Sequence, residues 1–122
     1  MIDLQAQGLR PFVPARDFAL SKDFYTALGC TLEWTDDRLA LFNLGGSRFY
    51  LQHYYVQEWA ENCMLHIAVR DAAQCFADVS ALIASGRFPG ARVAAPRHEP
   101  YGAWVTYVWD PCGVLLHLAQ WD

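Results

Sequence analysis

Three histidines lie in stretches that read as β-strands, and imidazole is the side chain best suited to metal binding and proton transfer near neutral pH. They are His53, His66 and His117. Because side chains alternate between the two faces of a strand, all three could face one cavity. A site built from these imidazoles is one hypothesis. The simpler alternative is that each is a polar group on a half-buried strand, hydrogen-bonded to a neighbour or a ligand.

The other chemically active residues are isolated in the sequence. None of the serines has a nucleophile-elbow sequence around it. Cys112 lies in an Asp-Pro-Cys-Gly turn with no base nearby, which favours an inert, exposed turn thiol. His98 and Glu99 precede Pro100, which favours a solvated loop over an acid–base pair. The four cysteines form no Cys-x-x-Cys pair, so we expect reduced thiols rather than a zinc site or disulfides.

Aromatic residues are the more informative group, because the chain has five Trp, six Tyr and seven Phe in 122 residues. A core of this size does not readily absorb so many rings. Flat aromatic walls bind flat aromatic ligands. The alternative for any single ring is packing in the core or in a dimer interface. Six rings come from different predicted strands and loops: Trp34, Phe42, Phe49, Trp59, Tyr101 and Trp104.

Charge and composition exclude several classes of partner. The formal net charge is −4 and Lys22 is the only lysine, which argues against a nucleic-acid-binding surface. An acidic chain rich in rings suits a cationic or neutral aromatic ligand. No apolar run reaches signal-peptide or membrane-span length, so we expect a cytoplasmic protein without a membrane partner. The length predicts one domain over residues 1–122.

Hydrophobic spacing predicts two helices. Residues 17–28 and 71–85 have apolar positions at helical intervals, with Asp17 and Asp71 as caps and Gly29 and Gly86 as C-terminal stops. Asp71 and Gln74 resemble a capping box. The remaining apolar stretches predict strands, at about 8–14, 30–35, 38–44, 47–55, 63–70, 91–95, 102–109 and 113–120.

The order of these elements is β-α-β-β-β, and it occurs twice. Module one covers about 8–55 and module two about 63–120, with residues 59–62 as the joining segment. A short pattern repeats as well: the stretch 13–17 opens one helix and the similar stretch 67–71 opens the other. The sequence therefore predicts an α+β fold of two βαβββ modules that form curved mixed sheets, each covered by its helix on one face.

Two sequence motifs resemble the vicinal oxygen chelate (glyoxalase, bleomycin-resistance and extradiol dioxygenase) superfamily, and most of all its bleomycin-resistance branch. The first is the opening Pro14-Ala15-Arg16-Asp17-Phe18, with Phe24-Tyr25 and Leu28-Gly29 after it. The second is Tyr101-Gly102-Ala103 followed by Asp110-Pro111-Cys112-Gly113-Val114-Leu115-Leu116. The resemblance spans nearly the whole chain and implies the glyoxalase/bleomycin-resistance fold.

In metal-dependent members of that superfamily, His and Glu side chains on the sheets hold a divalent ion. When the superfamily's ligand positions are transferred to this chain, the position on the first strand is occupied by Arg10, which cannot bind a metal. The fourth-strand position falls near Leu51 or Gln52 and the last-strand position on His117, while His66 resembles the fifth-strand histidine but is shifted by two residues. We therefore expect no catalytic residues, no metal and no cofactor.

The resemblance and the rings together predict a non-catalytic protein that sequesters a small, planar, cationic natural product of the bleomycin type in a groove at a homodimer interface. In the superfamily the first strand is often exchanged between subunits. The alternative is a metal-dependent lyase, isomerase or dioxygenase with a rearranged histidine site. A further possibility is an unrelated small-molecule ligand. The predicted ligand-binding residues are Trp34, Phe49, Leu51, His53, Trp59, His66, Tyr101, Trp104 and His117.

Overall fold

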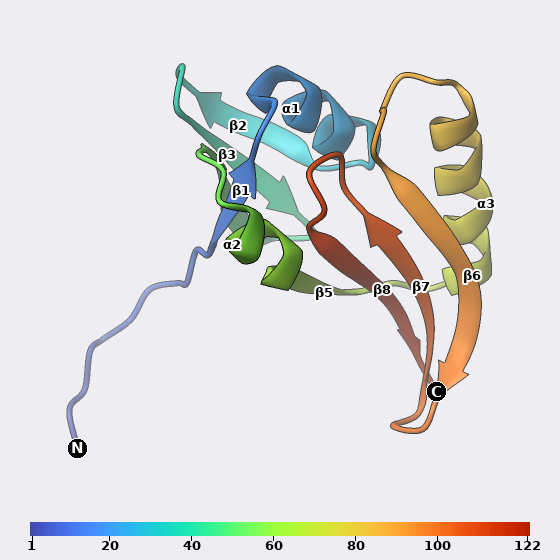
Figure 1. Cartoon of the computed structure of the whole chain (residues 1–122). Coiled ribbons are helices and arrows are strands. Elements are labelled where there is room, and N and C mark those ends of the chain that lie inside the picture. The colour runs from blue at the N-terminus through green and yellow to red at the C-terminus, as the bar shows by residue number, and fades with distance from the viewer.

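The first module is a four-stranded sheet with one helix against it. The computed structural model describes residues 1–122. It begins with β1 (Phe12–Ala15), α1 (Phe18–Ala27), β2 (Thr31–Thr35), β3 (Leu39–Leu44) and β4 (Ser47–His53). The strand order is β1-β4-β3-β2, with β1 parallel to β4 and the other pairs antiparallel. Figure 1 shows α1 lying against this sheet.

The second module repeats this plan. A short helix, α2 (Gln57–Asn62), leads into β5 (Met64–Ala68), α3 (Ala72–Ala84), β6 (Arg92–Glu99), β7 (Ala103–Trp109) and β8 (Leu115–Trp121). The strand order is β5-β8-β7-β6, again with one parallel pair, β5 with β8. The predicted α+β fold of two βαβββ modules with mixed sheets is confirmed.

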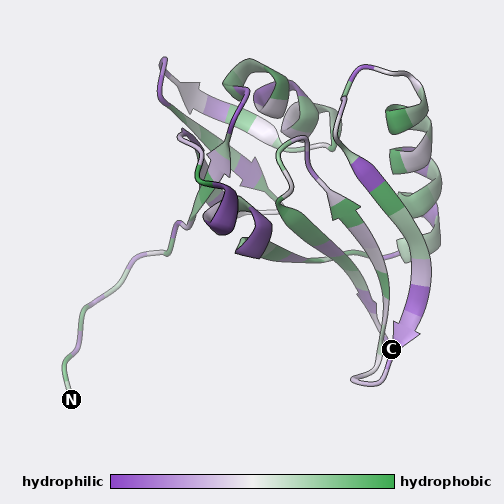
Figure 2. Cartoon of the chain, in the orientation of Figure 1, coloured by the Kyte–Doolittle hydropathy of each residue, from purple (hydrophilic) through white to green (hydrophobic).

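The structure differs from the sequence prediction at three places. The joining segment forms α2, whose N-cap residue Val56 makes no side-chain capping bond. Figure 2 colours α2 as hydrophilic over most of its length, so it carries no apolar stripe that would have revealed it. The strand predicted at 8–14 is Phe12–Ala15, and the chain toward the N-terminus extends away from the body (Figure 1). Strand β6 continues to Glu99, so His98 and Glu99 lie on a strand rather than in a loop.

The long helices begin and end where the sequence places their signals. The Asp17 side chain accepts a hydrogen bond from the Leu20 amide at 3.1 Å, and the Asp71 side chain accepts one from the Gln74 amide at 3.0 Å. The Gln74 side chain donates to Asp78 instead of closing a capping box. Each carboxylate satisfies one of the amides that have no partner within the helix.

One hydrophobic core joins the two modules on their helix-covered sides. Its central contact links α1 to the turn between β7 and β8: the Tyr25 hydroxyl donates to Asp110 at 2.7 Å, and both residues are buried. The Asp110 carboxylate also accepts from the amides of Cys112 and Val114. These three bonds compensate a buried charge that would otherwise be costly. The core cluster contains Val13, Phe24, Tyr25, Phe42, Phe49, Leu51, Val79, Phe88, Val108, Val114, Leu116 and Leu118, among others.

The other face of each sheet carries no helix, and we call these the first and second open faces. On the first, four side chains form a row across β1, β4, β3 and β2, because they are register partners: Phe12, Tyr50, Leu41 and Trp34. On the second, the equivalent row across β5, β8, β7 and β6 is His66, His117, Tyr107 and Ala94. These two rows position the candidate site.

Candidate functional site

The row on the first open face is aromatic and partly exposed. The rings of Phe12 and Tyr50 stack with centroids 5.1 Å apart. Trp34 lies at the other end of the row and is 48% exposed. Arg10 crosses the row, because its guanidinium lies 5.6 Å from the Tyr50 ring centroid and donates to the Tyr50 hydroxyl at 2.8 Å. One end of the row is thus covered by a cation, and the Trp34 end is open.

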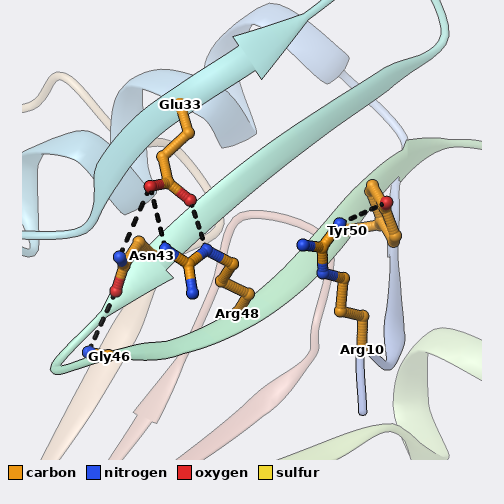
Figure 3. A network of polar contacts seen from close by, with 6 residues as sticks. All are labelled: Arg10, Glu33, Asn43, Gly46, Arg48 and Tyr50. Atoms are coloured by element: carbon orange, nitrogen blue, oxygen red, sulfur yellow. Dashed lines mark hydrogen bonds and ion pairs between the residues drawn. The ribbon is translucent and has the colours of Figure 1, made fainter. Parts of the chain in front are cut away.

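A network of fixed charges lies beside this row (Figure 3). Glu33 accepts hydrogen bonds from Arg48 at 2.6 and 3.2 Å and from Asn43 at 3.5 Å. The Asn43 side-chain oxygen accepts from the Gly46 amide at 3.0 Å. The bonds from Arg48 lower the pKa of Glu33, so this carboxylate is ionised at neutral pH. Because Glu33 and Arg48 neutralise each other, neither offers a free charge to a ligand.

The second open face is a cluster of rings and imidazoles. His66 and His117 are register partners on parallel strands, so their side chains rise side by side. The Tyr107 and His117 rings meet edge to face with centroids 5.0 Å apart. Trp121 contacts both His66 and Tyr101, with ring centroids at 5.6 and 5.4 Å. The five rings form a continuous wall drawn from four segments of the chain.

The polar groups of the second open face are oriented by one another. Glu99 accepts from the Tyr107 hydroxyl at 3.0 Å and pairs with Arg97. The bond from Arg97 lowers the pKa of Glu99. Burial and the neighbouring His66 lower the pKa of His117, so its imidazole is neutral at pH 7. The neutral imidazole of His117 and the paired charges make this face suited to binding through ring contacts and hydrogen bonds.

Four of the predicted site residues lie on the open faces. Trp34 is on the first, and His66, Tyr101 and His117 are together on the second. The two groups lie on different sheets, so the structure gathers three of the four in one place.

The other five predicted residues lie elsewhere. Phe49 and Leu51 are buried in the shared core, 7% and 0% exposed, so the open face does not include them. The His53 ring stacks on Phe18 of α1 at 5.3 Å, on the helix-covered side. The three histidines therefore do not share a cavity. Trp59 lies on α2 and contacts Tyr54, and Trp104 contacts His98 on the helix-covered side of the second sheet.

Sequence reasoning missed several side chains of the open faces. They are Phe12, Tyr50, Met64, Tyr107 and Trp121. The alternation of strand side chains contained a signal for some of them: Met64 lies two positions before His66, and Trp121 four positions after His117. For Tyr50 and Phe12 the alternation gave no answer. The sequence did not show which side chains of β1 or β4 face the core and which face outward.

The residues do not fit the divalent metal site that the superfamily resemblance implies. No group of three His, Cys, Asp or Glu side chains converges anywhere in the chain. Arg10 precedes β1 and is engaged with Tyr50. Leu51 is buried, and no carboxylate takes its place. Two adjacent imidazoles without a carboxylate do not make the mixed nitrogen and oxygen set that holds Fe, Mn or Ni.

Cys112 is not the exposed turn thiol that the sequence predicted. It is buried, and its Sγ atom lies 3.4 Å from the carbonyl oxygen of Pro14, so it belongs to the contact between the modules. Burial and the nearby Asp110 raise the pKa of this thiol to about 12. A thiol of this kind stays protonated and does not act as a nucleophile.

A separate cleft of about 860 Å³ lies between the modules. It is bordered by the C-terminal end of α1, by α3 and by β5, and its lining is mainly apolar, including Leu28, Leu44, Leu65, Val79 and Leu82. It borders the helix-covered sides of the sheets and also reaches His66 of the second open face and Arg48 beside the first.

Similarity to known proteins is found at the level of structure. No family model matches the chain, and no curated protein matches its sequence. A bleomycin-binding protein solved with bleomycin superposes with a TM-score of 0.75 at 20% identity, covering 96% of this chain and 100% of that one. A bleomycin resistance determinant encoded on the transposon Tn5 gives 0.76 at 23% identity, covering 96% and 99%. Lactoylglutathione lyase from Agrobacterium tumefaciens gives 0.70 at 15% identity, covering 94% of each chain.

These likenesses, over nearly the full length of every chain, show that this protein has the fold shared by bleomycin-resistance proteins and glyoxalases. They include both binding proteins and an enzyme, so the fold alone does not choose between holding a ligand and transforming it. None of the helices is long and apolar enough to cross a membrane.

Proposed function

We propose that this protein binds and sequesters a small planar natural product of the bleomycin type without chemical change. The observation that carries this proposal is the pair of open faces, each of which presents large rings that no helix covers. Trp34 is 48% exposed on the first, and Tyr101 and Trp121 are each 52% exposed on the second. Exposed rings at this density mark a binding surface.

The strength of ring stacking makes a passive mechanism sufficient. Each good stack contributes about 0.5–1.5 kcal/mol beyond the burial of area. Two or three stacks together with the burial of a planar ligand are enough for micromolar binding. Binding at that strength lowers the free ligand concentration by mass action alone. The bleomycin-bound relative of the same fold supports this choice of ligand class.

The proposed ligand is cationic, and the charges on the chain support this in part. The net charge is −4, which attracts cations at long range. Within the open faces, however, Arg10 already occupies the Tyr50 ring and Arg92 lies 4.1 Å from the Trp109 centroid. Exposed rings with no cation of the chain over them, such as Trp34, Tyr101 and Trp121, remain for a cation–π contact with the ligand.

We further propose that the groove forms between two copies of the chain. Within one chain the two open faces belong to different sheets, whose covered sides pack together in one core. In an isologous dimer the first open face of one copy lies opposite the second open face of the other, which buries both sets of rings. Each dimer then holds two equivalent grooves.

Calorimetry with bleomycin, followed by mass spectrometry of the recovered ligand, tests the binding. We expect saturable heat with a Kd in the micromolar range or below, and ligand of unchanged mass. The absence of both heat and tryptophan quenching at high micromolar bleomycin would overturn the proposal. Ligand recovered with altered mass would favour an enzyme.

A complementation experiment tests the shared groove. Trp34→Ala damages only the first open face and Trp121→Ala only the second. A mixed dimer of the two variants has one intact groove, made by the second face of the Trp34→Ala copy and the first face of the Trp121→Ala copy. We expect the mixture to regain sites of wild-type affinity that neither variant has alone. If the site lies within one chain, mixing restores nothing.

The alternative of a metal-dependent enzyme retains one observation, the side-by-side placement of His66 and His117. Elemental analysis of the purified protein tests it. Stoichiometric Fe, Mn, Ni or Zn that is lost in a His66→Ala, His117→Ala double variant would favour the enzyme over the binding protein.

A further inference from the structure

Met64 is an exposed methionine on the second open face, and its sulfur has an unusual neighbour. The side chain is 61% exposed. Its Sδ atom lies 3.4 Å from Nε2 of His117. An apolar side chain on an open face normally contacts other apolar groups, whereas this thioether meets an imidazole nitrogen. The contact brings together two atoms that can each ligate a metal, the imidazole nitrogen in the tautomer that carries its proton on Nδ1.

A third donor lies on the same face. His66 follows Met64 by two residues on β5, so alternation places both side chains on one side of the sheet. His66 is also the register partner of His117 on the adjacent strand β8. Adjacent strands lie about 4.8 Å apart, which places the two imidazoles next to each other. The sheet therefore holds one thioether and two imidazoles on neighbouring positions.

The chemistry of these donors selects one class of ion. None of the three is an anionic ligand, and the thioether is soft, which suits Cu(I) and not Mg, Ca or Mn. A borderline ion such as zinc is usually held by four ligands in which thiolate or carboxylate takes part. Here the nearby carboxylate of Glu99 is already engaged by Arg97 and Tyr107. A set of three ligands with no anion among them favours a soft monovalent ion.

We propose that Met64, His66 and His117 form a binding site for a soft monovalent metal ion, Cu(I), for which Ag(I) is a redox-inert substitute. The rings of Tyr107 and Trp121 stand beside the two imidazoles, and the exposed Met64 side chain leaves the site accessible to ions from solvent. The site needs neither the dimer nor an organic ligand, so it is independent of the sequestration proposed above.

Methyl NMR tests this site directly in the wild-type protein. The chain has two methionines, Met1 and Met64. With ¹³C-methyl-methionine labelling and titration with silver nitrate, we expect the Met64 methyl signal to shift and saturate, while Met1 at the exposed N-terminus does not move. Zinc at the same concentration should leave both signals unchanged. The measurement needs no substitution, so it does not depend on how a variant folds.

The four free cysteines are the competing soft ligands, and a second measurement separates them. In a Cys63→Ala, Cys75→Ala background, which removes the two cysteines that are not fully buried, we expect Ag(I) binding to persist. Adding Met64→Leu should weaken it at least about tenfold, the lower end of what loss of even a supporting residue costs a metal site. His98→Gln, on the opposite side of the sheet, is the matched control and should have no effect.

Three outcomes would overturn the proposal. The first is that the Met1 and Met64 signals shift alike, which indicates non-specific thioether binding. The second is that zinc shifts Met64 as strongly as silver does. The third is that Ag(I) binding disappears in the cysteine variant while Met64 never responds, which assigns all uptake to thiols.

Discussion

The two rows on the open faces occupy equivalent places in the two modules but hold different chemistry. The first row is Phe12, Tyr50, Leu41 and Trp34, and its polar neighbours are the Glu33–Arg48 pair and Arg10, which stay charged near neutral pH. The second row is His66, His117, Tyr107 and Ala94, and in it burial and the neighbouring His66 lower the pKa of His117.

The helix-covered sides, in contrast, repeat closely. Both long helices begin at an aspartate that accepts from an amide three residues on, and both are followed by a glycine with positive φ, Gly29 and Gly86. A covered side must fill a core and satisfy helix ends, which few residues do. An open face has no such constraint. The same fold therefore carries a row beside charged side chains in module one and a row that contains the titratable His117 in module two.

The largest expected effect concerns the turns that close the last hairpin of each module. In module two, Asp110 accepts three hydrogen bonds in the core; in module one, Asn43 makes the comparable turn bond to Gly46 near the surface. We expect Asp110→Ala to lower the free energy of unfolding by about 3 kcal/mol, because it leaves buried donors unpaired. Asn43→Ala should cost under about 1 kcal/mol. Urea denaturation measures both, and similar losses would contradict the difference.

The helix caps test where the modules are alike. Asp17→Ala and Asp71→Ala each remove one capping bond of nearly equal length, 3.1 and 3.0 Å. We expect each to lower the free energy of unfolding by about 1 kcal/mol. Denaturant unfolding with matched Asp→Asn variants, which keep a capping oxygen, should show little loss. If the two Asp→Ala variants lost free energies of unfolding that differ several-fold, the covered sides would be less equivalent than their geometry indicates.

The two open faces can be compared by measuring the affinity for bleomycin in one variant of each. Trp34→Ala and Trp121→Ala each remove one ring, and we expect bleomycin binding to weaken about 2- to 12-fold in each, which corresponds to about 0.5–1.5 kcal/mol per stack. Trp104→Ala removes a ring of similar exposure on the covered side and serves as the control. Calorimetry that finds all the loss in one of the two face variants would confine the groove to a single face.

The smallest effect is a pH dependence specific to the second row. The pKa of His117 is lowered in the folded chain by burial and by His66. As the pH falls below about 6.5, the unfolded chain takes up this proton first, so stability decreases until the pH passes the lowered folded value. His117→Gln should remove this component, seen as a flatter difference curve in urea midpoints between pH 7 and 5. An equal slope in both proteins would contradict the assignment.

Local signals predicted most of the fold. The aspartate caps, the glycine stops and the helical spacing act within a few residues of each other, so they can be recognised without knowing the tertiary structure. The helix α2 was missed because Val56 provides no cap and the helix is short and polar. The extent of β6 was missed because Pro96 and Pro100 imitate the end of a strand, whereas the register shift between Ala94 and Arg97 accommodates the first of them.

The candidate site was predicted only in part, and the same reason applies to every strand. Alternation states that Phe49, Leu51 and His53 lie on one side of β4 and Tyr50 on the other, but not which side the helix covers. The sequence predicted that rings and imidazoles form a binding surface. Of the residues it named, His66, His117, Tyr101 and Trp34 lie on the open faces.

The sequence by itself therefore determined the two long helices with their caps, the two-module order and the excess of rings, because these depend on near neighbours and composition. Tertiary structure decided that His53 lies against Phe18, that Leu51 is buried, and that the imidazoles of His66 and His117 stand together beside the sulfur of Met64. Strand pairing between residues about fifty positions apart brings those atoms together, and no local pattern records it.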